Sequence, residues 1–282
     1  QLRDADRKVE AEQAVRQAIA IARQQGHPGR LMEALKFRAI LLIPLGHYDE
    51  AKASVTEARA LAAKYFADKP LEFLQVEYSA GMVAQFRGEY DEAEALYLRA
   101  IQMAEAMRPP KEDTARLVKT FLGNVYRSQG RYAECERLLL AALPGARAAG
   151  DPVLALLGLG EAAFLQAELH RAEQYYREAW SESVRINGRD DSVTASVEIG
   201  LARVYSLQFR WNVAVQMLDH SIPIMERVGG PDSMELAYAL MERARCIHVM
   251  GDRARAIDDM ERSLAIQERA YGPDHYELSD SV

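Results

Sequence analysis

A six-residue stretch recurs at a fixed spacing, and this spacing constrains the fold more than any other feature of the sequence. The stretch Gly88–Ala93 returns with little change as Gly46–Ala51 and as Gly130–Cys135, so its glycines are 42 residues apart both times. A fixed period in this range indicates a solenoid built from helical hairpins. Each repeat of such a solenoid packs only on its neighbours, so 282 residues do not have to share one globular core.

The residue types in this stretch fit a turn between two antiparallel helices. Glycine ends the first helix because it adopts the left-handed conformation at low cost. The acidic residues after the tyrosine, such as Asp91 and Glu92, fall in the first turn of the next helix, where they suit the positive end of its dipole. The small residue that closes the stretch lets two helix backbones approach closely.

Small residues mark the same period along most of the chain. We call the small residue that closes each copy the anchor; the six anchors are Ala51, Ala93, Cys135, Ala172, Ala214 and Ala256. A glycine or alanine also lies twelve residues before every anchor, at Ala39, Gly81, Gly123, Gly160, Ala202 and Ala244. Glycine inside a helix costs about 1 kcal/mol relative to alanine. The three glycines therefore predict close packing between the two helices of a hairpin.

The helical period and the breaks between segments predict an all-α chain. Residues 4–25 are expected to form a first helix, and six hairpins follow it. Their predicted helices are 30–44 and 48–67, 71–87 and 90–107, 112–129 and 132–149, 152–167 and 169–187, 191–208 and 211–228, and 232–250 and 253–271. No segment shows the alternation of apolar and polar residues that a strand requires.

These features resemble the tetratricopeptide repeat, and Phe121–Cys135 is the best copy of its motif. The 42-residue period is longer than the usual repeat and is similar to that of the kinesin light chain type. The segment Ser263–His275 closely resembles the linker of that type. The resemblance covers almost the whole chain. It implies a right-handed superhelical solenoid of antiparallel helix pairs, with about six full repeats and partial repeats at both ends, whose concave groove binds peptides or protein segments.

The resemblance also implies which side chains line the groove, because the first helix of each hairpin lines the concave face in this family. The groove residues selected in this way are Lys36, Tyr78, Met82, Gln85, Asn124, Arg127, Glu161, Phe164, Arg203, Met241, Arg245 and His248. Four of them are cations, and arginine pairs carboxylates in a forked geometry, so we expect a partner segment of acidic character. The alternative is that these charges are solvated or pair with Glu33, Glu161 and Glu242.

A more specific partner is disfavoured by one position. Asn124 matches an asparagine with which similar repeats hold the backbone of a partner. The carboxylate clamp of chaperone-binding relatives also needs a lysine one turn earlier, and this chain has Thr120 there. The sequence therefore argues against a receptor for chaperone tails.

Other classes of function find little support. None of the six histidines has a metal-type spacing, and every glycine pair fits a helix break, so we expect no enzymatic activity, metal or cofactor. The net charge of −7 argues against direct nucleic-acid binding. We find no signal peptide and no apolar run long enough to span a membrane. Cys135 and Cys246 lie in different repeats and are expected to be buried, reduced thiols, as in a cytoplasmic protein.

We expect residues 1–282 to form a single solenoid domain that is a piece of a longer chain. The excess of arginine over lysine, 28 to 7, hints at a bacterial source. The first hypothesis for function is an interaction scaffold. An alternative is a sensory or regulatory module of a larger bacterial regulator, such as a transcription factor, kinase or ATPase, which binds a small ligand or peptide. A third is self-association through an uncapped end of the solenoid.

Overall fold

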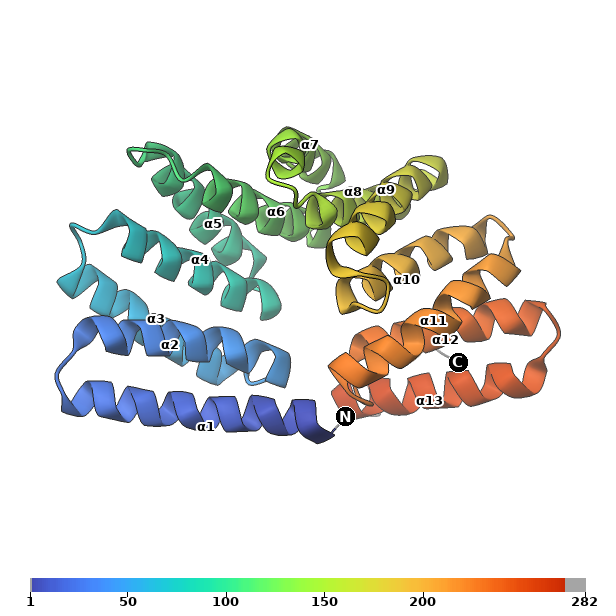
Figure 1. Cartoon of the computed structure of the whole chain (residues 1–282), viewed down its shortest axis with the longest axis horizontal. Coiled ribbons are helices and arrows are strands. Elements are labelled where there is room, and N and C mark those ends of the chain that lie inside the picture. The colour runs from blue at the N-terminus through green and yellow to red at the C-terminus, as the bar shows by residue number, and fades with distance from the viewer. Residues whose placement is uncertain (1, 272–282) are drawn as a thin grey trace. The chain divides into compact units, whose positions relative to one another are not determined.

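The computed structural model of the chain describes residues 2–271, and these residues are helical with no strand. The predicted all-α fold is therefore confirmed (Figure 1). The part of the predicted linker after Tyr271 lies outside the described residues. The helices are α1 Leu2–Gln24, α2 Pro28–Leu42, the short 3-10 helix η1 Ile43–Leu45, α3 Tyr48–Tyr65, α4 Pro70–Phe86, α5 Tyr90–Ala106, α6 Glu112–Ser128, α7 Tyr132–Ala148, α8 Val153–Leu165, α9 Leu169–Asn187, α10 Ser192–Leu207, α11 Trp211–Gly229, α12 Met234–Val249 and α13 Arg253–Tyr271.

The helices pair along the chain as the repeat period predicts. The hairpins are α2–α3, α4–α5, α6–α7, α8–α9, α10–α11 and α12–α13, and each is an antiparallel pair in close contact. The chain divides into two compact units; the one called first here is residues 6–150, which hold α1 from Asp6 onward and α2 to α7, and the one called second contains α8 to α13. Within each unit, successive hairpins stack in chain order, which is the organisation of a solenoid. That residues 1–282 act as a single domain stays a prediction.

Every hairpin turn contains a left-handed residue five positions before its anchor. Four of these residues are the glycines Gly46, Gly88, Gly130 and Gly251. The other two are Ala167, with φ of 59°, and Phe209, with φ of 62°. The turn geometry is thus kept in all six hairpins, although the glycine that marks it in the sequence is lost in two.

The small residues lie at points where the paired helices touch. Five anchors are fully buried and the sixth, Ala256, is 6% exposed. A methyl group on Gly81 would lie 2.5 Å from the Tyr97 ring, and one on Gly123 would lie 2.8 Å from Leu139. Gly160 faces Tyr176 in the same way, at 3.0 Å. The predicted close packing is therefore confirmed, and its cause is a large side chain that projects from the second helix, sixteen residues after each glycine.

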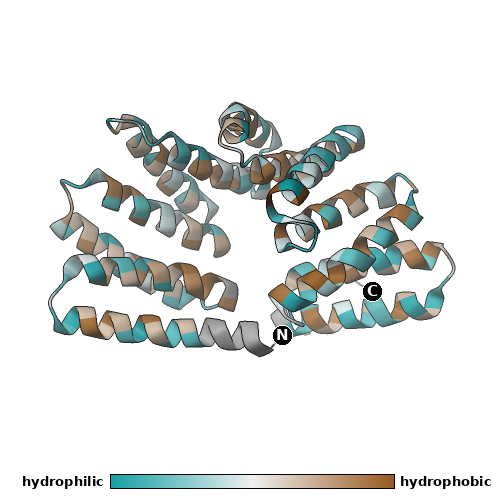
Figure 2. Ribbon diagram, in the orientation of Figure 1, coloured by the Kyte–Doolittle hydropathy of each residue, from teal (hydrophilic) through white to brown (hydrophobic). Residues whose placement is uncertain are grey.

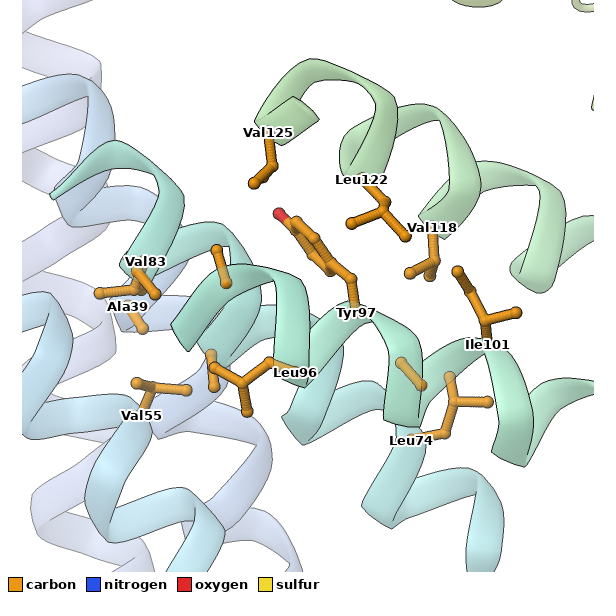
Figure 3. Close-up of a cluster of buried hydrophobic side chains, with 14 of the residues drawn as sticks. Ala39, Val55, Leu74, Val83, Leu96, Tyr97, Ile101, Val118, Leu122 and Val125 are labelled. Carbon is orange, nitrogen blue, oxygen red and sulfur yellow. The ribbon is translucent and has the colours of Figure 1, made fainter. Parts of the chain in front are cut away.

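The apolar core follows the helix stack and has no single centre. Apolar and polar stretches alternate along the helices, as Figure 2 shows, so each helix buries one face. In the first unit a continuous cluster of buried side chains extends from α2 to α6. Tyr97 on α5 is fully buried there and points toward Leu122 and Val125 on α6 (Figure 3). This packing between hairpins fixes the first helices beside one another and positions the candidate site.

Candidate partner-binding face

The first helices of the hairpins line the inner side of each stack. Within the first unit α2 contacts α4 and α4 contacts α6, and within the second unit α10 contacts both α8 and α12. The second helices of successive hairpins make few or no contacts with each other in the described residues. Since the first helices are closer together, each stack curves toward them. The helices that carry the predicted groove positions therefore lie on the inner side of their own unit, and that these positions line a groove stays a prediction.

In the first unit these positions form a mixed apolar and polar surface. Tyr78, Met82 and Gln85 on α4 and Asn124 and Arg127 on α6 are all half-buried. The Tyr78 ring packs edge-on against Phe121, with 5.5 Å between centroids, and burial raises the pKa of Tyr78 to about 12. Gln85 accepts a hydrogen bond of 2.9 Å from the Tyr97 hydroxyl. These contacts hold the apolar side chains and the Gln85 amide in place beside Asn124 and Arg127.

Lys36 on α2 is a buried residue and is not an open groove cation. Its Nζ donates to Gln75 Oε1 at 2.6 Å and lies 2.9 Å from Glu33 Oε1. Its side chain is only 8% exposed. The ammonium therefore holds α2 against α4, and the sequence did not indicate this burial.

In the second unit the groove charges neutralise one another. Glu161 on α8 and Arg203 on α10 form an ion pair of 3.2 Å, and the Arg203 guanidinium lies 4.2 Å from the centre of the Phe164 ring. Arg245 on α12 pairs with Glu242 at 3.3 Å but keeps a side chain that is 56% exposed. Met241 is half-buried and His248 is exposed. Lys36, Arg203 and Arg245 thus pair with Glu33, Glu161 and Glu242, as the alternative interpretation of the sequence expected.

Arg127 differs from the other three cations at predicted groove positions. Within residues 2–271 it has no hydrogen-bond or ion-pair partner, and its buried Nε is left without an acceptor. Asn124, one helical turn earlier, also makes no side-chain hydrogen bond in the described structure. Two neighbouring polar side chains of α6 therefore have no side-chain hydrogen-bond partner in the described structure.

Two buried carboxylates were missed by the sequence analysis. Glu77 on α4 and Glu198 on α10 both lie sixteen residues before an anchor, and this shared position is the signal that indicates them. Glu77 accepts from Arg59 at 2.8 Å and from Arg99 at 2.9 Å. Glu198 accepts from Trp180 Nε1 at 3.0 Å, from Ser221 at 2.8 Å and contacts His220 Nδ1 at 2.6 Å. Both carboxylates are satisfied by neighbouring second helices, so their role is to join hairpins.

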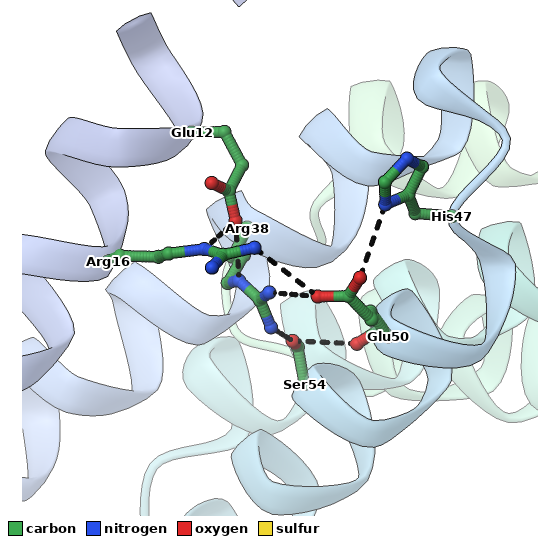
Figure 4. A network of polar contacts seen from close by, with 6 residues as sticks. All are labelled: Glu12, Arg16, Arg38, His47, Glu50 and Ser54. Carbon is green, nitrogen blue, oxygen red and sulfur yellow. Dashed lines mark hydrogen bonds and ion pairs between the residues drawn. The ribbon is translucent and has the colours of Figure 1, made fainter. Parts of the chain in front are cut away.

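A third polar cluster joins the first three helices of the chain. Arg38 on α2 donates to Glu12 at 3.2 Å and to Ser54 at 3.0 Å, and it pairs with Glu50 (Figure 4). Hydrogen bonds from His47 and then from Arg38 hold the pKa of Glu50 below its ordinary value. Arg16 completes the cluster through Glu12. Acids and bases are balanced in this network, so it serves the packing of α1 on α2 and α3.

Two other kinds of site were searched for among the described residues. In this part of the chain no group of three His, Cys, Asp or Glu side chains is placed to hold a metal ion. No helix between residues 2 and 271 is long and apolar enough to cross a bilayer. Cys135 and Cys246 are both buried and unpaired with any other cysteine, as predicted.

The stacked hairpins define an α-helical repeat protein of the solenoid class. Sequence models of the tetratricopeptide repeat match residues 152–227 and, separately, residues 79–107 and 249–277. These matches identify tetratricopeptide repeats in both parts of the chain. No curated protein sequence matches it.

Solved structures with the same fold share little sequence with this chain. The Cut9–Hcn1 hetero-tetramer of the APC/C matches with a TM-score of 0.72 at 16% identity, over 99% of this chain and 46% of that one. A putative kinesin light chain from Podosopora anserina with nearly identical TPR-like repeats matches with a TM-score of 0.56 at 16% identity. The match covers 71% of this chain and 97% of that one. NprR in complex with its cognate peptide NprX matches with a TM-score of 0.64 at 12% identity. The match covers 98% of this chain and 83% of that one. The predicted likeness to kinesin light chain repeats is confirmed at the level of the fold.

Proposed function

We propose that this chain is a protein-interaction scaffold that holds a peptide or protein segment on the first-helix side of its hairpins. The observation that carries the proposal is the surface formed by Tyr78, Met82, Gln85, Asn124 and Arg127. It combines fixed apolar groups with unpaired polar ones on stacked helices, which is the composition of a specific binding surface. The complex of NprR with a peptide, and the assembly of Cut9 with Hcn1, support this use of the fold.

The two units contribute different chemistry to this scaffold. The first unit offers an unpaired cation and an unpaired amide, which favour a partner segment with an acidic group and an exposed backbone. In the second unit Arg203 is neutralised by Glu161 and Arg245 is paired with Glu242, so Phe164, Met241 and His248 supply apolar and neutral polar contacts. Eleven of the twelve predicted groove residues belong to this proposed binding surface. The exception is Lys36, whose buried ammonium contributes to the packing of helices.

The proposal includes no catalytic step. The charged clusters built around Glu77, Glu198 and Arg38 join helices, and each is closed by its own partners. We propose a cytoplasmic scaffold whose partner is neither nucleic acid nor membrane. A sensory or regulatory module would use the same face, and no separate observation favours it.

A peptide-display selection on the full 282-residue chain tests the scaffold. Random twelve-residue peptides are selected on the immobilised chain, and their affinities are then measured for two variants. In the groove variant Met82→Glu is combined with Asn124→Ala on the concave side. In the control variant Leu98→Glu alters α5, where Leu98 is 40% exposed.

We expect the selected peptides to lose binding to the groove variant by at least about tenfold, because a buried charge replaces an apolar contact. The control variant should keep the wild-type affinity. Circular dichroism and thermal unfolding establish that both variants fold. Peptides that bind both variants equally well, or that lose affinity only for Leu98→Glu, would place the binding surface elsewhere and overturn the proposal.

A further inference from the structure

An exposed apolar patch lies along the hairpin turns of the second unit. Because α10 contacts both α8 and α12, the three hairpins stack in the same orientation and their turns lie along one edge. The position seven residues before the anchor falls at this edge and holds Leu165, Leu207 and Val249, all of them exposed. Phe209 and Met250, in the turns themselves, are exposed as well. We call these five side chains the turn-edge patch.

Phe209 is the most exposed member of the patch, and its backbone is strained. It is 75% exposed and has φ of 62°, a conformation that bulky residues rarely adopt. Its ring packs edge-on against Trp211, with 5.7 Å between centroids, and this contact orients the ring. Neither the strain nor the exposure of this ring stabilises a single chain. Strained residues gather at functional sites, so this one calls for a functional explanation.

The first unit shows that the repeat does not require such a patch. Its three hairpin turns have glycine at the left-handed position, at Gly46, Gly88 and Gly130. The position seven residues before the anchor is varied there, with Pro44, Phe86 and Ser128. The same turns therefore form without a row of aliphatic side chains and without a strained aromatic residue, so the patch in the second unit is an addition to the repeat.

The charge in the middle of the patch is neutralised within the chain. Arg210 follows Phe209, and its guanidinium lies 3.2 Å from a carboxylate oxygen of Glu173 and 4.0 Å from the centre of the Tyr205 ring. The middle of the patch thus presents no net charge. A surface that binds anionic lipid needs a cluster of cations, and the pairing of Arg210 removes the central one.

The two ends of the patch carry charges of both signs. At the α8–α9 turn Glu168 pairs with Arg171, and the Glu168 side chain remains 41% exposed. At the α12–α13 turn Asp252 is followed by Arg253, and both are exposed. The Arg253 side chain makes no hydrogen bond or ion pair within residues 2–271. One end therefore offers an exposed carboxylate, and the other offers an unpaired guanidinium.

We propose that the turn-edge patch is an interface between two copies of this chain, related by a two-fold axis at the α10–α11 turn. In such a contact both copies use the same surface, with its ends exchanged. Phe209 of each copy lies near the axis, and Leu165 faces the partner's Val249. Glu168 then lies opposite the partner's Arg253 at both ends. This complementarity of charge identifies a second copy as the occupant, and the interface is separate from the face proposed for the partner segment.

The first test is sedimentation velocity of the full 282-residue chain over a range of concentrations. We expect a dimer that dissociates on dilution. Leu207→Glu should raise its dissociation constant at least about tenfold, because it places a charge in an apolar interface. The control Ile186→Glu changes a residue that is 40% exposed at the opposite edge of the unit, and it should match wild type. A wild-type chain that stays monomeric at every concentration, or an equal effect of both substitutions, would overturn the proposal.

Phe209→Gly separates association from folding. It should weaken the dimer about tenfold, because the central ring is lost. It should also raise the urea midpoint of the monomer, measured on diluted protein, because glycine adopts the left-handed conformation without strain. Unchanged association, or a lower midpoint, would contradict the role given to Phe209 and with it the proposed interface.

Charge reversal tests the two-fold arrangement itself. Glu168→Arg and Arg253→Glu should each weaken the dimer of their own chains, since like charges then face each other at both ends. An equimolar mixture of the two variants should regain wild-type association, because every facing pair is then opposite in sign. Mixing cannot repair a folding defect within one chain. A mixture that associates no better than the separate variants would refute this geometry.

Vesicle flotation distinguishes a second copy from a lipid surface. The probe is a vesicle of phosphatidylcholine and phosphatidylserine, and the wild-type chain should remain unbound. Flotation of the wild-type chain that is lost in Leu207→Glu would assign the patch to a lipid surface and overturn the proposal.

Discussion

Glu161 and Arg203 stand at the same position in successive hairpins and form an ion pair, with 3.2 Å between Oε1 and Nη1. The Tyr176 hydroxyl donates to the same Glu161 oxygen at 2.7 Å, and the Arg203 guanidinium lies over the Phe164 ring. A single carboxylate therefore links the α8–α9 hairpin to α10. The pair also removes the charge of Arg203 from the groove, which is how the fold distinguishes it from Arg127.

Breaking this pair should destabilise the chain modestly. The two side chains are 21% and 30% exposed, so a half-buried pair with a stacked guanidinium should contribute about 1 kcal/mol. A double-mutant cycle with Glu161→Gln and Arg203→Gln measures the coupling in urea unfolding. The control cycle pairs Arg185→Gln with Glu182→Gln, an ion pair along the exposed side of α9. Coupling no larger than in the control cycle would show that the contact between hairpins adds nothing.

Gly81→Ala should destabilise the chain although alanine is the better helix former. The added methyl group would lie 2.5 Å from the ring of Tyr97, which is fully buried and has no room to move. Overpacking of this kind costs about 1–3 kcal/mol and outweighs a gain of about 1 kcal/mol in helix propensity. Urea unfolding measures the difference.

The matched control for this substitution is Gly145→Ala on α7, where the new methyl group would meet only the flexible Arg116 side chain at 3.4 Å. It should be neutral or stabilising. The cost of Gly81→Ala should also fall in a Tyr97→Leu background, because the smaller side chain leaves space. An equal cost in both backgrounds would mean that the contact with Tyr97 is not the cause.

Ala167→Gly should stabilise the chain. Ala167 takes φ of 59° at the turn between α8 and α9, where four other hairpins have glycine. The left-handed conformation costs a residue with a Cβ about 1–2 kcal/mol, so glycine should raise the free energy of unfolding by about 1 kcal/mol. The control Ala141→Gly, at an exposed helical site on α7, should lower it by about 1 kcal/mol. Destabilisation by both substitutions would contradict the turn geometry.

The two thiols should be inert in the folded chain. Burial raises the pKa of Cys135 to about 11 and also raises the pKa of Cys246. The thiolate is the reactive form, and at pH 7.5 less than about one in a thousand Cys135 side chains carries it. A disulfide reagent should therefore modify both residues only as the chain unfolds, at a rate that rises with urea. The exposed position in Ser128→Cys should react at once, and equally fast modification of the native thiols would refute their burial.

The helices and their pairing were predictable from the sequence because the signals are local and repeat. The glycine, the acidic first turn and the anchor place α3, α5 and α7 to within two residues of their predicted bounds. The small residues twelve positions before the anchors predicted a close approach, and the structure adds the Tyr97, Leu139 and Tyr176 side chains that require it. In a solenoid each hairpin depends mainly on itself and its neighbours, so a periodic sequence carries most of the fold.

The state of each groove side chain was decided by the tertiary structure. The sequence placed Lys36, Arg127, Arg203 and Arg245 on equivalent faces and left open whether they were paired. Whether a cation is neutralised depends on which side chain the neighbouring helix brings within hydrogen-bond distance, and this distance is set by packing. For the same reason the sequence did not predict that Lys36 is buried or that Glu77 and Glu198 join hairpins. It also did not predict the left-handed conformation of Ala167 and Phe209. The sequence by itself determined a repeating helical scaffold. Only the packing of the hairpins determined that Arg127, among the four predicted groove cations, has no partner in the described structure. The reason is that an ion pair needs a particular neighbouring side chain as well as a repeating position.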